Sequence, residues 1–361
     1  MEPIKKFFEF VIERQEMWHR RFVLKQEYPF SEDTILANNK FTNVYRQLDK
    51  TSLWVHTNII KPYNESNKTL LDKRNVLLNI VNFRWFNNYH IHYELGLLDH
   101  STFDVNMYAN GLVEYIKEKP LSNTSAYLTP SISGQTQIES NAILLTVLHS
   151  QIDLYIDRMS KIKNGGDLKD LIKTLPYLGN FMSYEIYCDL VETDLTSCNL
   201  DSVISKGPGS AKGMKLIFGN NNYLDNMKTL YNVQGEYLKD FKYNNYLEPK
   251  DGSLSYRVIE HSLCEYMKYV RLEENYTLNK TTSNTKYKKV PIVDIIVDGS
   301  GMGIIDKKER SLHTFNEGNK IDAMYPLHSP EVITYIKGLK IVNIRSEKYI
   351  NQLKKLKTPT K

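Results

Sequence analysis

The chain has 361 residues, of which 41% are hydrophobic and 25% are charged, and its formal net charge is +5. This composition is typical of a folded globular protein and excludes a chain that is disordered throughout. The pI near 8.7 lies below the value above about 9 expected of a dedicated nucleic-acid-binding domain. A DNA-binding role would therefore require cations gathered on one surface.

Cysteine content and hydropathy indicate the cellular compartment. Cys188, Cys198 and Cys264 are too few for a disulfide framework and lack the CxxC spacing of a structural zinc site. The first 21 residues carry charges throughout, unlike a signal peptide. No segment approaches the roughly 20 apolar residues needed to cross a bilayer. We therefore expect an intracellular, soluble protein with no membrane partner.

The first half of the chain is predicted to be helical. Apolar residues at helical spacing predict helices over residues 3–25, from 34 to about 48, 74–96 and 103–118. Ser31 or Asp33 is the expected N-cap of the second helix. Residues 119–137 form the clearest loop, because they are rich in Ser, Thr, Pro and Gly. The strongly apolar helix over residues 139–162 is expected at the centre of the core.

A helical hairpin follows. Residues 167–175 and 180–191 predict two short helices joined by the turn "PYLG". Helix–hairpin–helix DNA-binding elements have this arrangement with an "LPGxG" turn, and Tyr177 stands here in place of the first glycine. The backbone N–H groups around Gly179, at a helix N-terminus, would suit a phosphate. The alternative is an ordinary αα-hairpin.

The stretch "KGPGSAKGMK", residues 206–215, combines three glycines with three lysines ahead of the apolar helix "MKLIFG". Backbone amides freed by glycine beside lysines predict an anion site formed by Gly207, Gly209, Lys212 and Lys215. The alternative is a flexible loop. The stretch is not a Walker A motif, because Gly207 and Gly213 are six apart and Met214 follows.

Two polar sets flanked by aromatic residues are candidates for gripping phosphates or stacking bases. In "FTNVYRQLDK", Asn43, Arg46 and Asp49 recur at i, i+3 and i+6 and would share one helix stripe. The alternative is a solvated face with an Arg–Asp pair. The second set, in "FRWFNN", contains Arg84, Asn87 and Asn88.

The helix expected over residues 258–274 has two kinds of face. Its apolar stripe consists of Ile259, Leu263, Met267 and Val270. Glu260, Cys264 and Lys268 lie at i, i+4 and i+8 on another side, beside His261 and Glu265. Ordinary Glu–Lys pairing, at roughly 0.2–0.5 kcal/mol a pair, is one interpretation. The other is a general base, Glu260 or Glu265, next to cations that hold an anion.

Two further hypotheses concern the same helix. Lys268, one turn from Cys264, would lower the pKa of the thiol. His261 and Glu265 could ligate a metal, although two ligands are weak evidence for a site. The sequence leaves the cofactor open, with Mg2+ as a candidate and no metal ligand assigned.

The chain is expected to be mainly α, with a multi-helix domain over residues 1–276 that contains the helix–hairpin–helix-like, DNA-glycosylase-like element. Residues 277–290 are expected to form a polar linker. Residues 291–361 are expected to form a small α+β segment with a disordered tail. Within it, "VPIVDIIVDGSGMGIID" predicts a strand that runs into a glycine turn.

The quoted motifs, from "ERQEMWHRRF" through "IEHSLCEYMKYVR", occur together in the order of one family. Over residues 10–275 the chain resembles the helical domain of phage 5-hydroxymethyluracil DNA kinases and related DNA base hypermodification proteins. Within that family it looks closest to the α-glutamyl/putrescinyl thymine pyrophosphorylases. It contains no P-loop kinase domain, so a kinase activity is not expected.

The resemblance implies a transferase that displaces pyrophosphate from the 5-methylene of a hydroxymethyluracil-derived base with an amine or amino acid. The implied partners are DNA containing modified thymine, the amine substrate and a separate 5-hydroxymethyluracil DNA kinase. The setting would be the cytoplasm or a viral replication compartment. The alternatives are a glycosylase-like base-excision enzyme and a nonenzymatic DNA-binding module that partners the kinase.

Candidate roles follow from this resemblance. The candidate catalytic residues are Glu260, Glu265, Lys268, Asp189 and Asp49. The candidate phosphate- or DNA-binding residues are Arg46, Arg84, Asn87, Gly179, Gly207, Gly209, Lys212 and Lys215.

Overall fold

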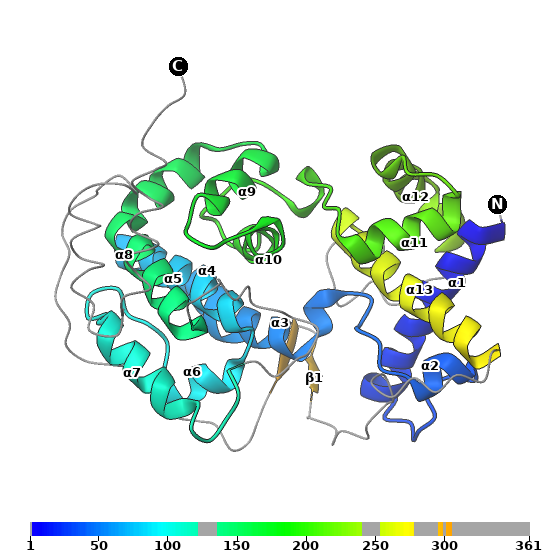
Figure 1. The fold of residues 1–361 in the computed structure, drawn as a ribbon, viewed down its shortest axis with the longest axis horizontal. Coiled ribbons are helices and arrows are strands. Elements are labelled where there is room, and N and C mark those ends of the chain that lie inside the picture. Colours follow the sequence, from blue (N-terminus) through cyan, green and yellow to red (C-terminus); the bar gives the residue numbers. More distant parts are fainter. Residues whose placement is uncertain (1, 122–135, 240–252, 278–294, 299–300, 305–361) are drawn as a thin grey trace. The chain divides into compact units, whose positions relative to one another are not determined.

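The computed structural model describes residues 2–121, 136–239, 253–277, 295–298 and 301–304. These residues belong to two compact units, unit 1 (Met1–Leu53 and Leu200–Asp306) and unit 2 (Trp54–Asn199 and Lys307–Lys361). Helices dominate both units (Figure 1), which confirms the predicted mainly α fold class.

Unit 1 is built around three helices that run side by side: α1 (Glu2–Trp18), α11 (Pro208–Phe218) and α13 (Tyr256–Thr277) (Figure 1). The apolar stripe of α1 explains this packing, because Phe7, Phe10 and Trp18 join Leu263 and Tyr266 of α13 in one buried core. The other elements of this unit are the π-helical turn η1 (His19–Val23), α2 (Thr34–Asn38), the 3-10 turns η2 (Arg46–Leu48) and η4 (Leu200–Ser202), and α12 (Tyr223–Tyr237).

Two glycines bring α11 unusually close to α13. A Cβ added to Gly213 would lie 2.1 Å from the backbone oxygen of Leu263, and one added to Gly209 would lie 2.3 Å from Cys264 Sγ. Both distances are below any real Cβ contact. The G-x-x-x-G spacing therefore places two backbones in direct contact, as small residues do wherever helices approach closely.

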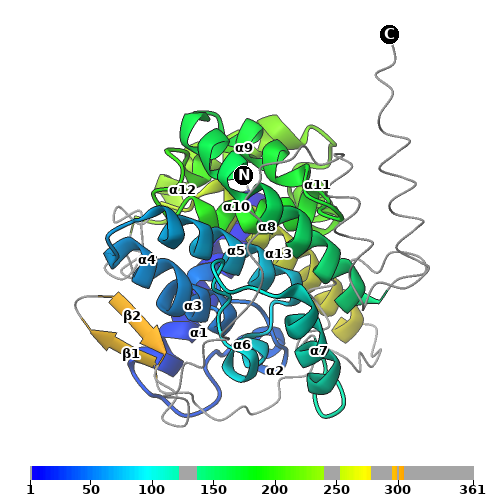
Figure 2. The same cartoon turned by 90° about the vertical axis from the view of Figure 1, so that its left-hand side faces the viewer.

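In unit 2, the long helix α8 (Gln137–Lys161) packs against α5 (Leu70–Phe86) and α7 (Val105–Tyr115), next to which it appears in Figure 2. Most α8 side chains are buried, as its apolar sequence predicts. Capping boxes at Thr69 and Thr136 begin α5 and α8. The remaining helices are α3 (Lys50–Val55, spanning the unit boundary), the π-helical turn η3 (His56–Ile60), α4 (Lys61–Glu65), α6 (Tyr89–Leu95), α9 (Gly165–Lys173) and α10 (Asn180–Leu190).

Two predicted helices are broken at asparagines. Asp33 caps the second helix, as expected, but α2 ends at Asn38, because the extended Asn39 turns its side chain back onto the Ile35 carbonyl. The helix predicted over residues 74–96 is interrupted at Asn87, which adopts a left-handed conformation with φ of 48°. Asn88 then caps α6. Short polar side chains that hydrogen-bond locally favour such ends over helix interiors.

The predicted strand near residue 297 is confirmed. β1 (Ile295–Asp298) pairs antiparallel with β2 (Gly301–Ile304), with Ile295 opposite Ile304. The expected linker beyond residue 277, most of the loop over residues 119–137 and the rest of the C-terminal segment lie outside the described residues. The predicted domain boundaries stay predictions.

Candidate functional site

The polar side of α13 forms the centre of the candidate site in unit 1. Ile259 and Leu263 of the predicted apolar stripe are fully buried. The side chains of Glu260 and Glu265 are also largely buried, although both are acidic. Lys268 Nζ lies 3.5 Å from Glu265 Oε2. The helix pairing expected from the sequence is therefore present, within an environment that excludes most water.

Lys268 is held in a specific position. Its ammonium group lies 4.4 Å from the centroid of the Phe41 ring and donates a hydrogen bond to the backbone oxygen of Lys40. Burial lowers the pKa of Lys268 below that of an ordinary lysine, although the nearby Glu265 carboxylate acts in the opposite direction. Lys268 is consequently a desolvated cation of the kind that interacts strongly with an anion.

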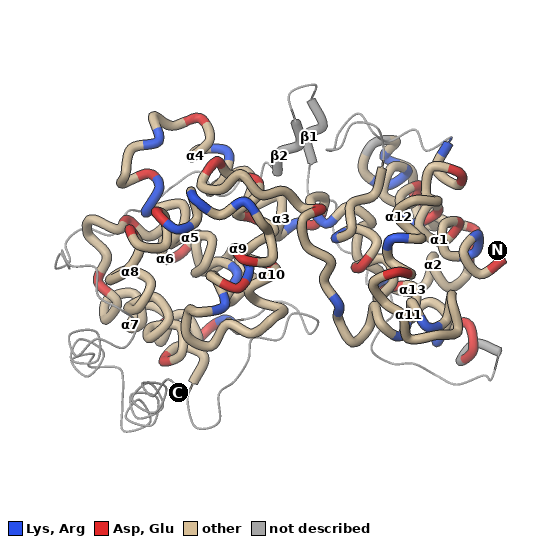
Figure 3. The backbone as a smooth tube through the Cα atoms, turned by 90° about the horizontal axis from the view of Figure 1, so that it is seen from above, with Lys and Arg blue, Asp and Glu red and all other residues tan. Residues whose placement is uncertain are grey.

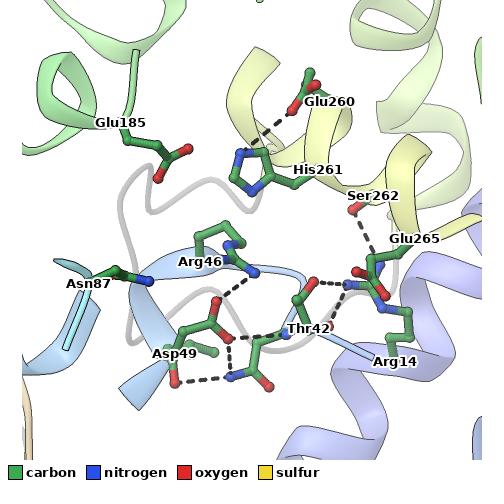
Figure 4. A network of polar contacts seen from close by, with 12 residues as sticks. Arg14, Thr42, Arg46, Asp49, Asn87, Glu185, Glu260, His261, Ser262 and Glu265 are labelled. Carbon is green, nitrogen blue, oxygen red and sulfur yellow. Dashed lines mark hydrogen bonds and ion pairs between the residues drawn. The ribbon is translucent and has the colours of Figure 1, made fainter. Parts of the chain in front are cut away.

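Arg14 of α1 reaches into the same cluster (Figure 4). Its Nη2 donates to the Thr42 backbone oxygen at 2.5 Å, its Nη1 lies 3.5 Å from Ser262 Oγ, and its guanidinium stacks on Phe10. Burial lowers the pKa of Arg14 to about 10, while the carboxylates of Glu265 and Asp49 partly offset this effect. Arg14 is therefore still charged at neutral pH and links α1, the segment after α2 and α13.

The segment over residues 42–49 contributes the third side of the cluster. Asn43, Arg46 and Asp49 do come together, but on an extended segment and the turn η2 rather than on one helix face, so the predicted helical stripe is wrong. Asn43 Nδ2 donates to Asp49 Oδ1 at 3.0 Å, and Arg46 Nη1 lies 2.8 Å from Asp49 Oδ2 (Figure 4). The alternative Arg–Asp pair is thus confirmed. Asn87 and Glu185, also labelled in Figure 4, belong to unit 2.

The glycine- and lysine-rich stretch is helical rather than a loop. α11 begins at Pro208 with Gly207 as its N-cap, so the backbone amides beyond its first turn are hydrogen-bonded within the helix. The Gly207 N–H already faces Ser210 Oγ and Glu260 Oε1, at 3.0 and 3.2 Å. Glu260 Oε2 lies 3.5 Å from His261 Nε2. A carboxylate of the protein itself therefore occupies the N-terminus of this helix, a favoured position for an anion.

The loop prediction failed because Gly209 and Gly213 serve close packing against α13, not backbone flexibility. Lys212 and Lys215 of α11 are exposed. Neither lysine forms an ion pair with Glu265, which pairs with Lys268.

The hypothesis that Lys268 activates Cys264 is wrong. The pKa of the Cys264 thiol is raised to about 11, first by partial burial and then by the Glu265 and Glu260 carboxylates, which outweigh Arg46 and Lys268. At neutral pH the thiol is therefore protonated and a poor nucleophile.

In unit 2, Arg84 and Asp189 pair with each other. Arg84 donates through Nε and Nη2 to both Asp189 oxygens, at 2.5 and 2.6 Å, and both side chains are almost fully buried. Arg84 Nη1 also contacts Asn87 Oδ1 at 3.3 Å and lies 3.9 Å from Glu185 Oε2. A bidentate, buried pair of this kind positions helices α5 and α10. The predicted roles of Arg84 as a DNA contact and of Asp189 as a catalytic residue stay predictions, and in this structure the two groups engage each other.

The predicted hairpin is present as α9 and α10, with Gly179 as the exposed N-cap of α10. Tyr177 adopts φ of 68° at the position where the motif has its first glycine. A bulky residue pays a conformational cost there that glycine avoids. Tyr177 therefore adopts a left-handed conformation that glycine would adopt without this cost.

Sequence reasoning missed Arg14, Thr42, Ser262 and Glu185. Arg14 carried a readable signal, since it lies within the apolar stripe of α1 next to Phe10 and Trp18, where a charged residue requires buried partners. Thr42 and Ser262 had no such signal, because their contacts depend on the tertiary structure.

The described residues contain no group of three or more His, Cys, Asp or Glu side chains suited to a metal ion, so His261 and Glu265 find no third ligand there. Among the described helices, none is both long and apolar enough for a membrane crossing.

These features define a helical domain with a half-buried ionic cluster in one unit and a buried Arg–Asp pair in the other. The family described as "5-hmdU DNA kinase, helical domain" matches residues 2–278, and the chain belongs to this family. The resemblance seen in the sequence motifs is thereby confirmed.

One curated relative is the 5-hmdU DNA kinase of Bacillus phage SP10, which is 25% identical over 288 residues. The alignment covers 73% of this chain and 44% of the relative, so the chain spans less than half of that protein's length. No solved structure matches the chain.

Proposed function

We propose that the chain acts in the modification of 5-hydroxymethyluracil-type bases in DNA, and that its unit 1 cluster is the catalytic site. The family membership over residues 2–278 supports the substrate class. Within the family, the proposed reaction is displacement of pyrophosphate from the C5 methylene by an amine or amino acid.

One observation carries the assignment of the site. Arg14 Nε and Arg46 Nε are buried and make no hydrogen bond with the described residues. The nearby Glu265 Oε2 is paired with Lys268 Nζ at 3.5 Å. Buried polar atoms are normally satisfied, so these two donors, from two separate segments beside the Glu265–Lys268 pair, are suited to contact a small polar ligand. They are also the chemical groups that the reaction requires.

The reaction can be divided among these residues. The amine nitrogen forms a bond to the methylene carbon while the C–O bond breaks and pyrophosphate leaves with the electron pair. Glu265 accepts the proton released from the nitrogen. Arg46 and Lys268 stabilise the charge that develops on the leaving oxygen, and their partial desolvation strengthens this effect.

A second candidate is a nonenzymatic DNA-recognition module. It is favoured by the family description, which names a helical domain of a kinase, and by the partial coverage of the phage relative. No specific observation favours the glycosylase alternative, and Asp189, in the last turn of α10, is buried against Arg84.

The test uses DNA that contains 5-pyrophosphoryloxymethyluracil, together with the twenty amino acids and common polyamines. Released pyrophosphate is quantified, and the DNA is digested to nucleosides for mass spectrometry. A new adduct with stoichiometric pyrophosphate release is the expected result. DNA binding without either product would overturn the transferase proposal and leave the recognition module.

Variants locate the site. Glu265→Gln is expected to lower the rate at least about 100-fold, the lower range for loss of a general base. Glu273→Gln is the matched control, because Glu273 lies on the same helix in an exposed ion pair with Lys6. If Glu265→Gln turns over like Glu273→Gln, then Glu265 is not the base.

A further inference from the structure

The two faces of α11 differ sharply in chemistry. Its inner face has Gly209 and Gly213 in contact with the α13 backbone. Its outer face exposes Lys212, Lys215 and Leu216. The glycine contact leaves α11 little freedom to move against α13. The backbone positions of Lys212 and Lys215 are therefore fixed relative to α13.

The α11 segment itself carries basic residues and no acidic ones. Residues 202–224 contain three lysines and no acidic residue. Figure 3 marks Lys and Arg in blue and Asp and Glu in red along the backbone. Lys206, Lys212 and Lys215 are exposed, and none forms an ion pair with a described residue. The run ends in the exposed turn "GNNN", residues 219–222.

We infer that the outer face of α11 and the following turn bind the phosphate backbone of duplex DNA, an inference that rests on the proposed function for its choice of partner. Lysines supply point charges for phosphates. The side chains of Asn220 and Asn222 hydrogen-bond within the protein and hold the turn that follows α11. Exposed lysines that form no ion pair with the described residues are complementary to a polyanion. Carboxylates lie at the two ends of this surface, where Glu260 faces the Gly207 N–H and Asp225 accepts from Asn222. Lys212 and Lys215 thus serve the DNA backbone instead of the leaving pyrophosphate.

Salt-dependent binding tests this directly. Affinity for unmodified duplex DNA is measured by fluorescence anisotropy for the wild type and for Lys212→Gln/Lys215→Gln over a range of salt concentrations. The slope of log K against log salt is negative, and each lost phosphate contact reduces its magnitude by about 0.9. The slope of the double variant should therefore be less steep than that of the wild type by about 1.8. If both proteins bind equally at about 1 M salt, this corresponds to binding about 60-fold weaker at about 0.1 M.

The control removes the same charge elsewhere in unit 1. Lys5→Gln/Lys25→Gln replaces two exposed lysines that lie outside α11 and its turn, and its slope should stay close to that of the wild type. The inference would be overturned if the α11 variant had the salt dependence of the wild type, or if both double variants showed the same reduction in salt dependence.

The outcome is separable from that of the proposed function, because binding to unmodified DNA requires no turnover. A reduced slope without any base adduct would remove the transferase proposal alone. Adduct formation by the wild type with an unchanged slope in the α11 variant would remove only the surface inference.

Discussion

The close contact between α11 and α13 leads to a prediction that contradicts ordinary helix propensity. Gly→Ala inside a helix normally stabilises by about 1 kcal/mol. At Gly213 the new Cβ would lie 2.1 Å from a backbone oxygen of Leu263, which cannot move aside as a side-chain atom can. The helices must separate by about 1 Å, and such overpacking costs about 1–3 kcal/mol or more. We expect Gly213→Ala to destabilise unit 1 by about 2 kcal/mol net.

Gly235 of α12 is the matched control, because its added Cβ would meet no atom within 4 Å. Gly235→Ala should therefore stabilise by about 0.5–1 kcal/mol. Urea denaturation followed by 19F NMR of 5-fluorotryptophan would isolate Trp18, which lies in unit 1, from the two tryptophans of unit 2. A Gly213→Ala protein at least as stable as the wild type would refute the close packing.

The remaining predictions concern unit 2. Burial lowers the pKa of His92 to about 4 from 6.5. As the pH falls, the unfolded chain therefore takes up the proton before the folded protein does. The free energy of unfolding should be highest above about pH 6.5 and should fall by up to about 3 kcal/mol towards pH 4. Urea denaturation at several pH values measures this dependence. If the free energy of unfolding of His92→Phe fell with pH as steeply as that of the wild type, His92 would not be the cause. Asp189→Asn should cost about 3 kcal/mol, because it removes the bidentate partner of the buried Arg84 and leaves the Glu185 carboxylate at 3.9 Å as its counter-charge. Denaturation curves measure the loss, and an Asp189→Asn protein as stable as the wild type would argue against a buried ion pair. Thr69→Ala should lower stability by about 1 kcal/mol through loss of the α5 cap, and Thr69→Ser should retain it when both are compared by thermal melting.

The helices of this protein could be predicted from sequence wherever periodic burial and local caps agree. α8 and α13 follow their apolar patterns, and Asp33 begins α2 as a cap. The errors fall where a local side-chain bond competes with the helix, as at Asn39, or where one residue enters the left-handed region, as at Asn87. Neither event changes the apolar spacing, so periodicity alone cannot detect it.

Glycine-rich sequence was misleading for a different reason. Spacing and composition are the same for a glycine that loosens a loop and for one that allows two helices to touch. Only the space around the missing Cβ separates them: it is filled at Gly213 and open at Gly179. The glycine at position 179 is consequently not required by packing within the described residues, which keeps the predicted phosphate contact at the α9–α10 turn open to experiment.

Arg14 shows why the centre of the site could be predicted only in part. The polar stripe of α13 is local, so Glu260, Glu265 and Lys268 were found from their spacing. The contacts of Arg14 instead join residues 28 and 248 positions away, Thr42 and Ser262. A buried guanidinium between these segments fixes α13 relative to the turn that carries Arg46, and its charge acts on Glu265. The arrangement of charges at the candidate site therefore depends on a residue whose importance no spacing within α13 could reveal.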